Sequence, residues 1–521
     1  MASNFSPNQS IRKPIVRSAG GVVAAQQTQA AAIGARVLDE GGNAVDAAVA
    51  TSFALGVCEP WMSGMGGGGL MVVRHQNGQV HAVDFGMRAP GALNIADYPL
   101  EDGIANDLFA WPAVRGDANM IGPHAIAVPG VVDGIACAHN AWGTRDWDDL
   151  LTPAIDLARR GLTVDWYATL VIAQAARGLS QSPASAARFL PDGGPPRSPM
   201  VASSELRLSM DGVADTLVTL AKDGPRSFYE GAIANRIAED IQRLGGSLSK
   251  ADLAAYHAKI VAPLEIKYRE ATIWATPELS AGPTLADTLR RLEAAVAPGK
   301  TPDAAWFCSF ATALGAAYKA RLASMGDVEN GRSTGCTTHF SVTDKDGMTV
   351  SVTQTLLSVF GSMVTLPDTG ILMNNGIFWF DPRQGKPNSL APSKKCLSNM
   401  CPIVLESAGK VFGIGASGGR RILPAVAQIA GFLTDFDMDL EDALHMPRID
   451  SSGSGPVLCD STMPNEIRGA LDETFEVLVK KRSELPSWFA NISTTGSIAG
   501  QALGGSEPSL PWSDAFAAKR L

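Results

Sequence analysis

The spacing of apolar and polar residues predicts helices over much of the first 330 residues. Residues 22–60 are rich in alanine at helical spacing, and Gly41 and Gly42 divide them into two helices. Asn43 or Asp46 is suited to cap the start of the second helix. The same reasoning predicts further helices within residues 125–161, 166–330 and 421–436.

Strand patterns occur in two places. Leu70–Arg74 and Val80–Phe85 are apolar runs joined through an Asn-Gly pair, which is a strong hairpin signal. From about Gly335 to Ala416 the chain changes to β-branched alternation broken by turns. Because the strands come as hairpins rather than as regular βαβ units, the pattern favours antiparallel sheets covered by helices.

Composition and charge narrow the class of protein. The 521 residues are 45% hydrophobic and 18% charged, which predicts a globular protein with two domains or one large layered domain. The net charge of −9 argues against a nucleic-acid or anionic-membrane partner, because phosphate binding needs clustered lysine and arginine. No run of about 18 apolar residues is present, so no membrane span is expected.

The seven cysteines include no C-x-x-C pair, so the sequence predicts free thiols in a reducing compartment and no metal centre. The first twenty residues lack the apolar stretch of a secretory signal. We therefore expect a cytoplasmic protein.

Two glycine-rich segments allow several interpretations. Gly413–Gly419 matches G-x-G-x-x-G, with Asp435 about twenty residues on, and matches G-x-S-x-G around Ser417. Its late position disfavours a dinucleotide site, and the only downstream histidine, His445, lies too near Asp435 in sequence for a hydrolase triad. A turn that points backbone N–H groups at a negative oxygen fits better. Ser63–Gly69 lacks the Lys-Ser/Thr of a phosphate loop, so close backbone packing is the favoured explanation.

The stretch "GCTTHFSVTDKDGMTVSVTQTL" places Thr337 directly behind a small Gly-Cys pair at the head of a strand. A threonine hydroxyl is a poor nucleophile unless a base lies beside it. If the chain is cut before Thr337, the new α-amine supplies that base, since its pKa is about 7.7–8.0. An ordinary strand threonine is the alternative that these residues alone leave open.

The same stretch, continued by "FGS" and "GILMNN", resembles the start of the small subunit of the γ-glutamyltranspeptidase family of N-terminal-nucleophile hydrolases. Further ordered likenesses, including "GGNAVDAAVATSFALGVCEP", "AVPGVVDG" and "PNSLAPSKKCLSNMCP", extend over nearly the whole chain. The resemblance implies an α+β fold, a four-layer αββα sandwich with two antiparallel sheets between helical layers. It also implies self-cleavage between Cys336 and Thr337 into a large subunit, residues 1–336, and a small subunit, residues 337–521, intertwined as one domain.

The resemblance assigns the chemistry to four residues. Thr337 corresponds to the nucleophile and Thr355 to the second threonine that hydrogen-bonds it. Gly418 and Gly419 correspond to the pair whose N–H groups form the oxyanion hole. These four positions agree with the family, so the reaction centre is expected to be intact.

The donor-binding positions depart from the family. Ser398 and Asn399 stand where the family has two serines that bind the donor carboxylate. Leu357 replaces an asparagine that contacts the glutamyl group, and Trp379 replaces an acidic residue that pairs with the substrate α-ammonium. Gly86 stands where the family has the arginine that grips the α-carboxylate, and Arg88, two positions on, is either a carboxylate ligand by a different route or a plain structural arginine. A buried ammonium beside Trp379 would lack a counter-charge, so glutathione is not the expected substrate.

The sequence therefore predicts an amidohydrolase that releases a small carboxylate-bearing acyl group, oxamate-like or glutaryl-like, without a metal or organic cofactor. A γ-glutamyl hydrolase or transpeptidase, and an uncut non-catalytic scaffold, are the alternatives. The expected partners are a small-molecule amide and the two cleaved subunits as a heterodimer, with pairing of two heterodimers left open.

Overall fold

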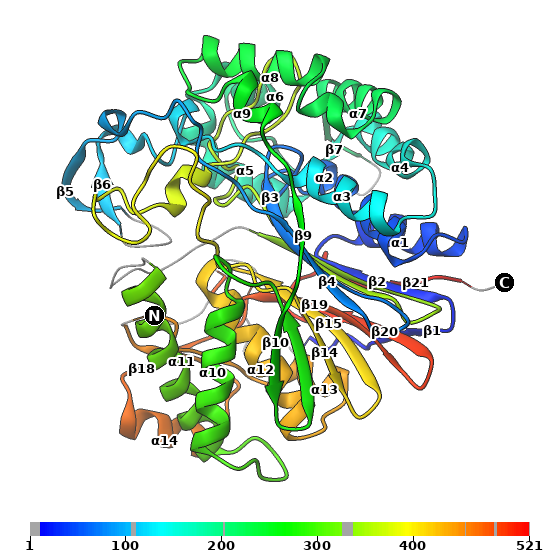
Figure 1. Cartoon of the computed structure of the whole chain (residues 1–521), viewed down its shortest axis with the longest axis vertical. Coiled ribbons are helices and arrows are strands. Elements are labelled where there is room, and N and C mark those ends of the chain that lie inside the picture. The colour runs from blue at the N-terminus through cyan, green and yellow to red at the C-terminus, as the bar shows by residue number, and fades with distance from the viewer. Residues whose placement is uncertain are drawn as a thin grey trace.

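A computed structural model describes residues 11–105, 111–201, 204–325, 337–453, 455–483 and 487–519. Two seven-stranded sheets lie face to face, and helices cover the outer face of each (Figure 1). Helices α1–α9 lie above one sheet in Figure 1, and α10–α14 lie below the other. This is the predicted α+β sandwich of four layers, αββα.

Every strand pairing recorded in the two large sheets is antiparallel. The first, here called the β12 sheet, has the order β21-β2-β12-β13-β3-β4-β9 and the second, the β15 sheet, has the order β1-β20-β19-β15-β14-β11-β10. The strands of the β12 sheet are β21 (Asp514–Ala517), β2 (Gly21–Ala25), β12 (Thr338–Asp344), β13 (Thr349–Thr355), β3 (Gly68–Arg74), β4 (Val80–Phe85) and β9 (Lys259–Val261). Those of the β15 sheet are β1 (Val16–Ser18), β20 (Gln501–Ser506), β19 (Asn491–Ile498), β15 (Lys410–Ser417), β14 (Ile403–Ser407), β11 (Ala271–Ala275) and β10 (Leu264–Tyr268). The smaller sheets contain β5 (Leu100–Ile104) and β6 (Pro112–Val114), β7 (Leu162–Thr163) and β8 (Arg207–Leu208), and β16 (Ile449–Asp450), β17 (Val457–Asp460) and β18 (Val477–Lys480).

The helices bury one large apolar cluster on each outer face. Helix α2 is buried on almost all sides, and the Asn43 and Asp46 side chains form a capping box at its start, as predicted. The helices are α1 (Thr28–Asp39), α2 (Ala44–Cys58), α3 (Val131–Trp142), α4 (Trp147–Arg160), α5 (Trp166–Leu179), α6 (Pro183–Phe189), α7 (Asp211–Asp223), α8 (Ala232–Arg243), α9 (Lys250–Ala254), α10 (Gly282–Ala295), α11 (Ala304–Met325), α12 (Ile422–Asp435), α13 (Leu440–His445) and α14 (Asn465–Thr474).

Two segments expected to be helical are strands. Residues 22–25, at the start of the alanine-rich stretch, belong to the fully buried strand β2. Residues 259–275, inside the segment predicted to be mainly helical, form β9, β10 and β11. Short apolar runs do not distinguish a buried strand from a helix by period alone, and here the pairing partners decide.

Small polar side chains fill the space between the two sheets. Along β12, Phe340 and Val342 face the helices, whereas His339, Ser341 and Thr343 face the β15 sheet. The Thr343 hydroxyl reaches that of Thr495 across the interface at 2.9 Å. Strand β12 alternates polar and apolar residues as a half-exposed strand would, but both of its faces are buried.

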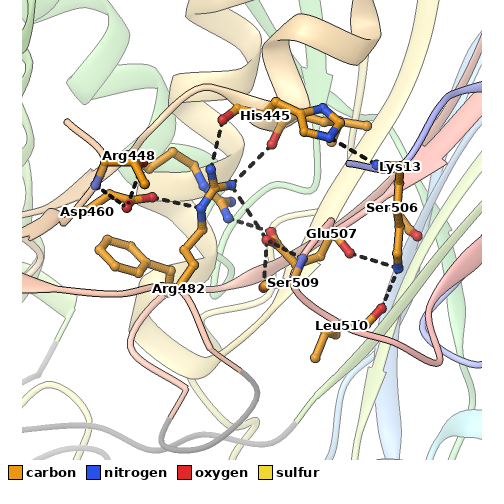
Figure 2. Close-up of polar contacts among 12 residues, drawn as sticks. Lys13, His445, Arg448, Asp460, Arg482, Ser506, Glu507, Ser509 and Leu510 are labelled. Atoms are coloured by element: carbon orange, nitrogen blue, oxygen red, sulfur yellow. Dashed lines mark hydrogen bonds and ion pairs between the residues drawn. The ribbon is translucent and has the colours of Figure 1, made fainter. Parts of the chain in front are cut away.

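A buried charge network joins the N-terminal segment to the C-terminal part of the chain (Figure 2). Arg448 and Glu507, at most 2% exposed, form an ion pair of 2.5 Å, and Arg482 pairs with Asp460 at 2.7 Å. The Lys13 ammonium donates to the Glu507 carbonyl oxygen at 3.1 Å. Burial opposes ionisation of Glu507, but the two arginines outweigh it and lower its pKa. The network fixes the edge of the β15 sheet where β1 and β20 pair.

Candidate active site

Thr337 is the first described residue after the gap and directly precedes β12. Its side chain is buried, and its Oγ1 lies 3.4 Å from Thr355 Oγ1 at the end of β13. The Thr355 hydroxyl also accepts the Leu357 N–H at 2.8 Å. The separation of 3.4 Å is long for an O–H···O bond, so the two hydroxyls are adjacent rather than tightly bonded. The predicted partner of the cleavage bond, Cys336, lies outside the described residues.

The glycine run at the start of β3 holds Thr355 in place. Gly68 pairs with Thr355 in the β12 sheet. A Cβ on Gly67 would stand 2.3 Å from the Thr355 carbonyl oxygen, and one on Gly69 would stand 2.6 Å from the Thr353 carbonyl oxygen. These glycines are needed because the backbones approach too closely for any side chain. The close-packing interpretation of Ser63–Gly69 is confirmed.

Gly418 and Gly419 form the turn between β15 and α12. Their φ angles are 137° and 61°, a region in which residues with a side chain are strained. Among the described residues, no hydrogen bond is recorded that uses the N–H of either glycine. A Cβ on Gly418 would also approach the Ala490 Cα to 3.0 Å. The turn therefore offers two free N–H groups at a helix start, the arrangement expected of an oxyanion site.

The two parts of the candidate site meet across the sheet interface. The His339 ring lies against Gly415, where a Cβ would stand 2.2 Å from its Cε1. Burial lowers the pKa of His339 to about 3, so the ring is neutral. Gln26 makes a second connection, because its amide joins Thr338 Oγ1, at 3.2 Å, to the Ser417 hydroxyl. The residue after Thr337 and the residue before Gly418 thus share one partner.

The two other interpretations of Gly413–Gly419 are wrong. Ser417 faces Gln26, while Asp435 accepts from the Tyr268 hydroxyl at 2.8 Å and His445 accepts the Lys13 backbone N–H at 3.1 Å. These contacts do not join serine, histidine and aspartate in a triad. Strand β15 lies between antiparallel neighbours, which is not the βαβ setting of a dinucleotide site.

Two of the departures from the family, Leu357 and Trp379, lie in one apolar cluster. Leu357 and Trp379 are 4% and 3% exposed and belong to the cluster that contains Met87 and Met400. Leu357 has a φ of 85°, a strained value for leucine, and its N–H is the one bonded to Thr355. The nearest acidic residue along the chain, Asp381, is held by Arg383 at 2.7 Å. The structure thus places Trp379 in the same apolar cluster as Leu357, whose N–H is bonded to the second threonine.

Ser398 and Asn399 are held by a residue that the sequence did not point to. Arg321, on α11, donates to the Ser398 carbonyl oxygen at 2.8 Å and lies 3.3 Å from Asn399 Oδ1. The Ser398 hydroxyl is buried and has no hydrogen-bond partner among the described residues. Arg88 follows Met87, a member of the apolar cluster, and its backbone pairs with that of Val128. A role for Arg88 in binding a carboxylate stays a prediction.

Glu59, together with Gln26, was also missed by the sequence reasoning. Its carboxyl oxygen lies 2.7 Å from Thr338 Oγ1. A carboxyl directly after an apolar helix, in "CEP", was the available signal. Over the described ranges, no group of three or more histidine, cysteine or acidic side chains is placed to hold a metal ion. No helix within those ranges is long and apolar enough to span a bilayer.

The fold has solved counterparts among acylases. The structure titled cephalosporin acylase from Bacillus halodurans superposes with a TM-score of 0.83 over 100% of this chain and 99% of that one, at 24% identity. The γ-glutamyltranspeptidase of Helicobacter pylori superposes with a TM-score of 0.53 over 60% of this chain and 86% of that one, at 29% identity. The architecture is that of the N-terminal-nucleophile hydrolases.

Residues 30–334 and 327–511 match the sequence model of the family described as gamma-glutamyltranspeptidase. The Acylase ACY 1 proenzyme of Pseudomonas sp. (strain V22) is 32% identical over 498 residues, 88% of this chain and 87% of the relative. The Glutathione hydrolase proenzyme of Escherichia coli (strain K12) is 29% identical over 553 residues, 95% and 91% of the two chains. The chain belongs to the γ-glutamyltranspeptidase family and is an enzyme of the amidohydrolase and acyltransferase type.

Proposed function

We propose that the protein is an amidohydrolase that matures by cutting its own chain between Cys336 and Thr337. Thr337 Oγ1 then attacks an amide carbonyl carbon while its own α-amine accepts the hydroxyl proton. The N–H groups of Gly418 and Gly419 hold the oxyanion, the amine leaves with a proton, and water releases the acid from the acyl-enzyme. Thr355, beside the nucleophile, would orient the Thr337 hydroxyl.

The proposed large subunit, residues 1–336, and small subunit, residues 337–521, would stay together after cleavage. Both large sheets contain strands from both parts, with β2 pairing β12 and β11 pairing β14. Separating them would expose both cores. The proteins named above as proenzymes share this family, which supports processing.

The observation that carries the choice of substrate is the apolar cluster around Leu357 and Trp379. A γ-glutamyl donor brings an α-ammonium, whereas Leu357 and Trp379, which replace two of the family's donor contacts, are apolar and buried. Asp381 could not substitute, because Arg383 holds it. An unpaired buried charge costs several kcal/mol, about 3 or more. An acyl group without the ammonium, oxamate-like or glutaryl-like, fits, with Ser398, Asn399 and Arg88 as candidate partners for its carboxylate.

A γ-glutamyl hydrolase or transferase is the second candidate, because the similarity to a glutathione hydrolase covers 95% of the chain. A panel of chromogenic anilides decides between them. Glutaryl-p-nitroanilide should be hydrolysed with a higher kcat/KM than γ-glutamyl-p-nitroanilide, and the Thr337→Ala variant should hydrolyse neither. Preference for the γ-glutamyl compound would overturn the substrate assignment. A chain that stays uncut and inactive on every amide would favour the scaffold.

A further inference from the structure

A chain of buried polar side chains runs behind the proposed nucleophile to the oxyanion turn. Thr338 Oγ1 lies 2.7 Å from Glu59 Oε2 and 3.2 Å from Gln26 Oε1, and Gln26 Nε2 donates to the Ser417 hydroxyl. None of the four side chains is more than 1% exposed. Because Thr338 follows Thr337 and Ser417 precedes Gly418, this chain connects both parts of the proposed reaction centre.

The orientation of the Gln26 amide follows from its surroundings. Its Nε2 also faces the Asn491 carbonyl oxygen, at 3.3 Å, and a carbonyl can only accept. The Gln26 amide oxygen must therefore be the atom that faces Thr338. It accepts a hydrogen bond, and the only hydrogen available in that contact belongs to the Thr338 hydroxyl.

The single hydroxyl hydrogen of Thr338 cannot serve both neighbours. If Thr338 donates to Gln26, the contact with Glu59 needs a hydrogen from the carboxyl group, so Glu59 must be protonated. If Glu59 is ionised, it takes the Thr338 hydrogen, and the Gln26 amide oxygen then faces a hydroxyl oxygen with no hydrogen between them. All contacts of the chain are satisfied together only when Glu59 is neutral.

The environment of Glu59 favours the neutral form. Burial raises its pKa to about 8, and the hydrogen bond with Thr338 offsets only part of this effect. Cys58, the titratable residue that precedes it, also has its pKa raised by burial and by the neighbouring Glu59. Within the described ranges, no cationic side chain is recorded as acting on the Glu59 pKa.

A cavity of about 200 Å³ borders Glu59. Besides Glu59, its titratable lining residues are Cys58, Asp165 and Tyr167, and the Asp165 carboxylate already accepts the Ala168 N–H at the start of α5. The cavity has polar lining and is large enough for several water molecules. Water in this cavity would be the source of a proton for Glu59.

We propose that protonated Glu59 is a positioning residue, whose hydrogen bond to Thr338 holds the start of β12 against the turn that carries Gly418 and Gly419. This inference rests on the proposed function, in which Thr337 is the nucleophile. Ionisation of Glu59 breaks the chain at Gln26 and lets Thr337 shift relative to the oxyanion turn. The enzyme should therefore lose activity at alkaline pH through kcat rather than KM.

The test compares the wild type with Glu59→Gln and Glu59→Ala by measuring kcat and KM for the best anilide of the panel from neutral pH to well above pH 8. Glutamine supplies an N–H donor that does not titrate, so Glu59→Gln should keep kcat within a few-fold at neutral pH and lose the alkaline decline. Glu59→Ala should lower kcat on the order of 10²-fold with little change in KM. Glu406→Gln, which removes a carboxyl at the far end of β14, is the matched control and should behave as the wild type.

An alkaline decline in Glu59→Gln equal to that of the wild type would overturn the proposal, and so would an unchanged kcat in Glu59→Ala. Intact mass and a thermal melt of each variant show whether it folds and is cut. If Glu59→Ala does not fold, the pH profiles of the wild type and Glu59→Gln still decide. A wild type that is uncut and inactive would instead refute the proposed function, so the two failures are distinguishable.

Discussion

Trp379→Asp should convert the apolar cluster into a site that accepts an α-ammonium. Trp379 is 3% exposed, and the sequence resemblance assigns it to the position of the family's acidic residue. An unpaired charge in such a site costs about 3–5 kcal/mol, and each 1.4 kcal/mol is tenfold in affinity or rate. Restoring the partner should therefore raise the γ-glutamyl to glutaryl ratio of kcat/KM by on the order of 10²-fold.

The assay measures kcat/KM for both anilides on the same preparation, so that partial misfolding cancels in the ratio. Trp379→Asn is the matched control, since it opens the same space without a charge. Because an apolar surrounding raises the pKa of a new carboxyl, the ratio should increase with pH in Trp379→Asp alone. An unchanged ratio, or an equal rise in Trp379→Asn, would refute the assignment of this cluster to the acyl end of the substrate.

Two further substitutions test the framework of the site. Glu507→Gln should lower the free energy of unfolding by about 3–5 kcal/mol, because it leaves Arg448 buried without its partner, and urea titration measures this. The arginines hold the pKa of Glu507 below its usual range. The stabilisation that Glu507 gives the folded state is therefore full above its pKa in the unfolded chain, about 4.3, and is lost as the pH falls through its lower pKa in the folded protein. The free energies of unfolding of Glu507→Gln and the wild type should therefore differ least in strong acid. Gly418→Ala should still fold, as circular dichroism would show, but its kcat should fall on the order of 10²-fold. The reason is that the added Cβ would stand 3.0 Å from the Ala490 Cα and displace the turn. A wild-type kcat in Gly418→Ala, or an unchanged free energy of unfolding in Glu507→Gln, would contradict these roles.

The sequence predicted much of the fold because local signals agreed with the tertiary structure. The Asn-Gly hairpin, the Asn43 cap and the helix after Gly419 all appear where expected. Strand β2 was missed because Val22 to Ala25 form a short apolar run, which gains its identity from pairing with β12, more than 300 residues away. Local periodicity carries no information about such a partner.

The candidate site could be predicted only where a family motif marked it. Thr337, Thr355, Gly418 and Gly419 were named from such motifs; Thr337 directly precedes β12, Thr355 ends β13, and Gly418 and Gly419 follow β15. Glu59 carries no motif of its own, and its importance depends on a contact with Thr338, 279 positions along the chain. Contacts of that length arise from sheet topology, which the spacing of residues does not reveal.

The most direct test of the mechanism is the N-terminal sequence and intact mass of the purified protein. A mature enzyme should give fragments of about 35 and 19 kDa, in proportion to the whole chain of 54.5 kDa, and the smaller one should begin with Thr337. Thr337→Ala should remain a single chain without activity. Full amide turnover by an uncut chain, or cleavage that persists in Thr337→Ala, would contradict Thr337 as both nucleophile and base.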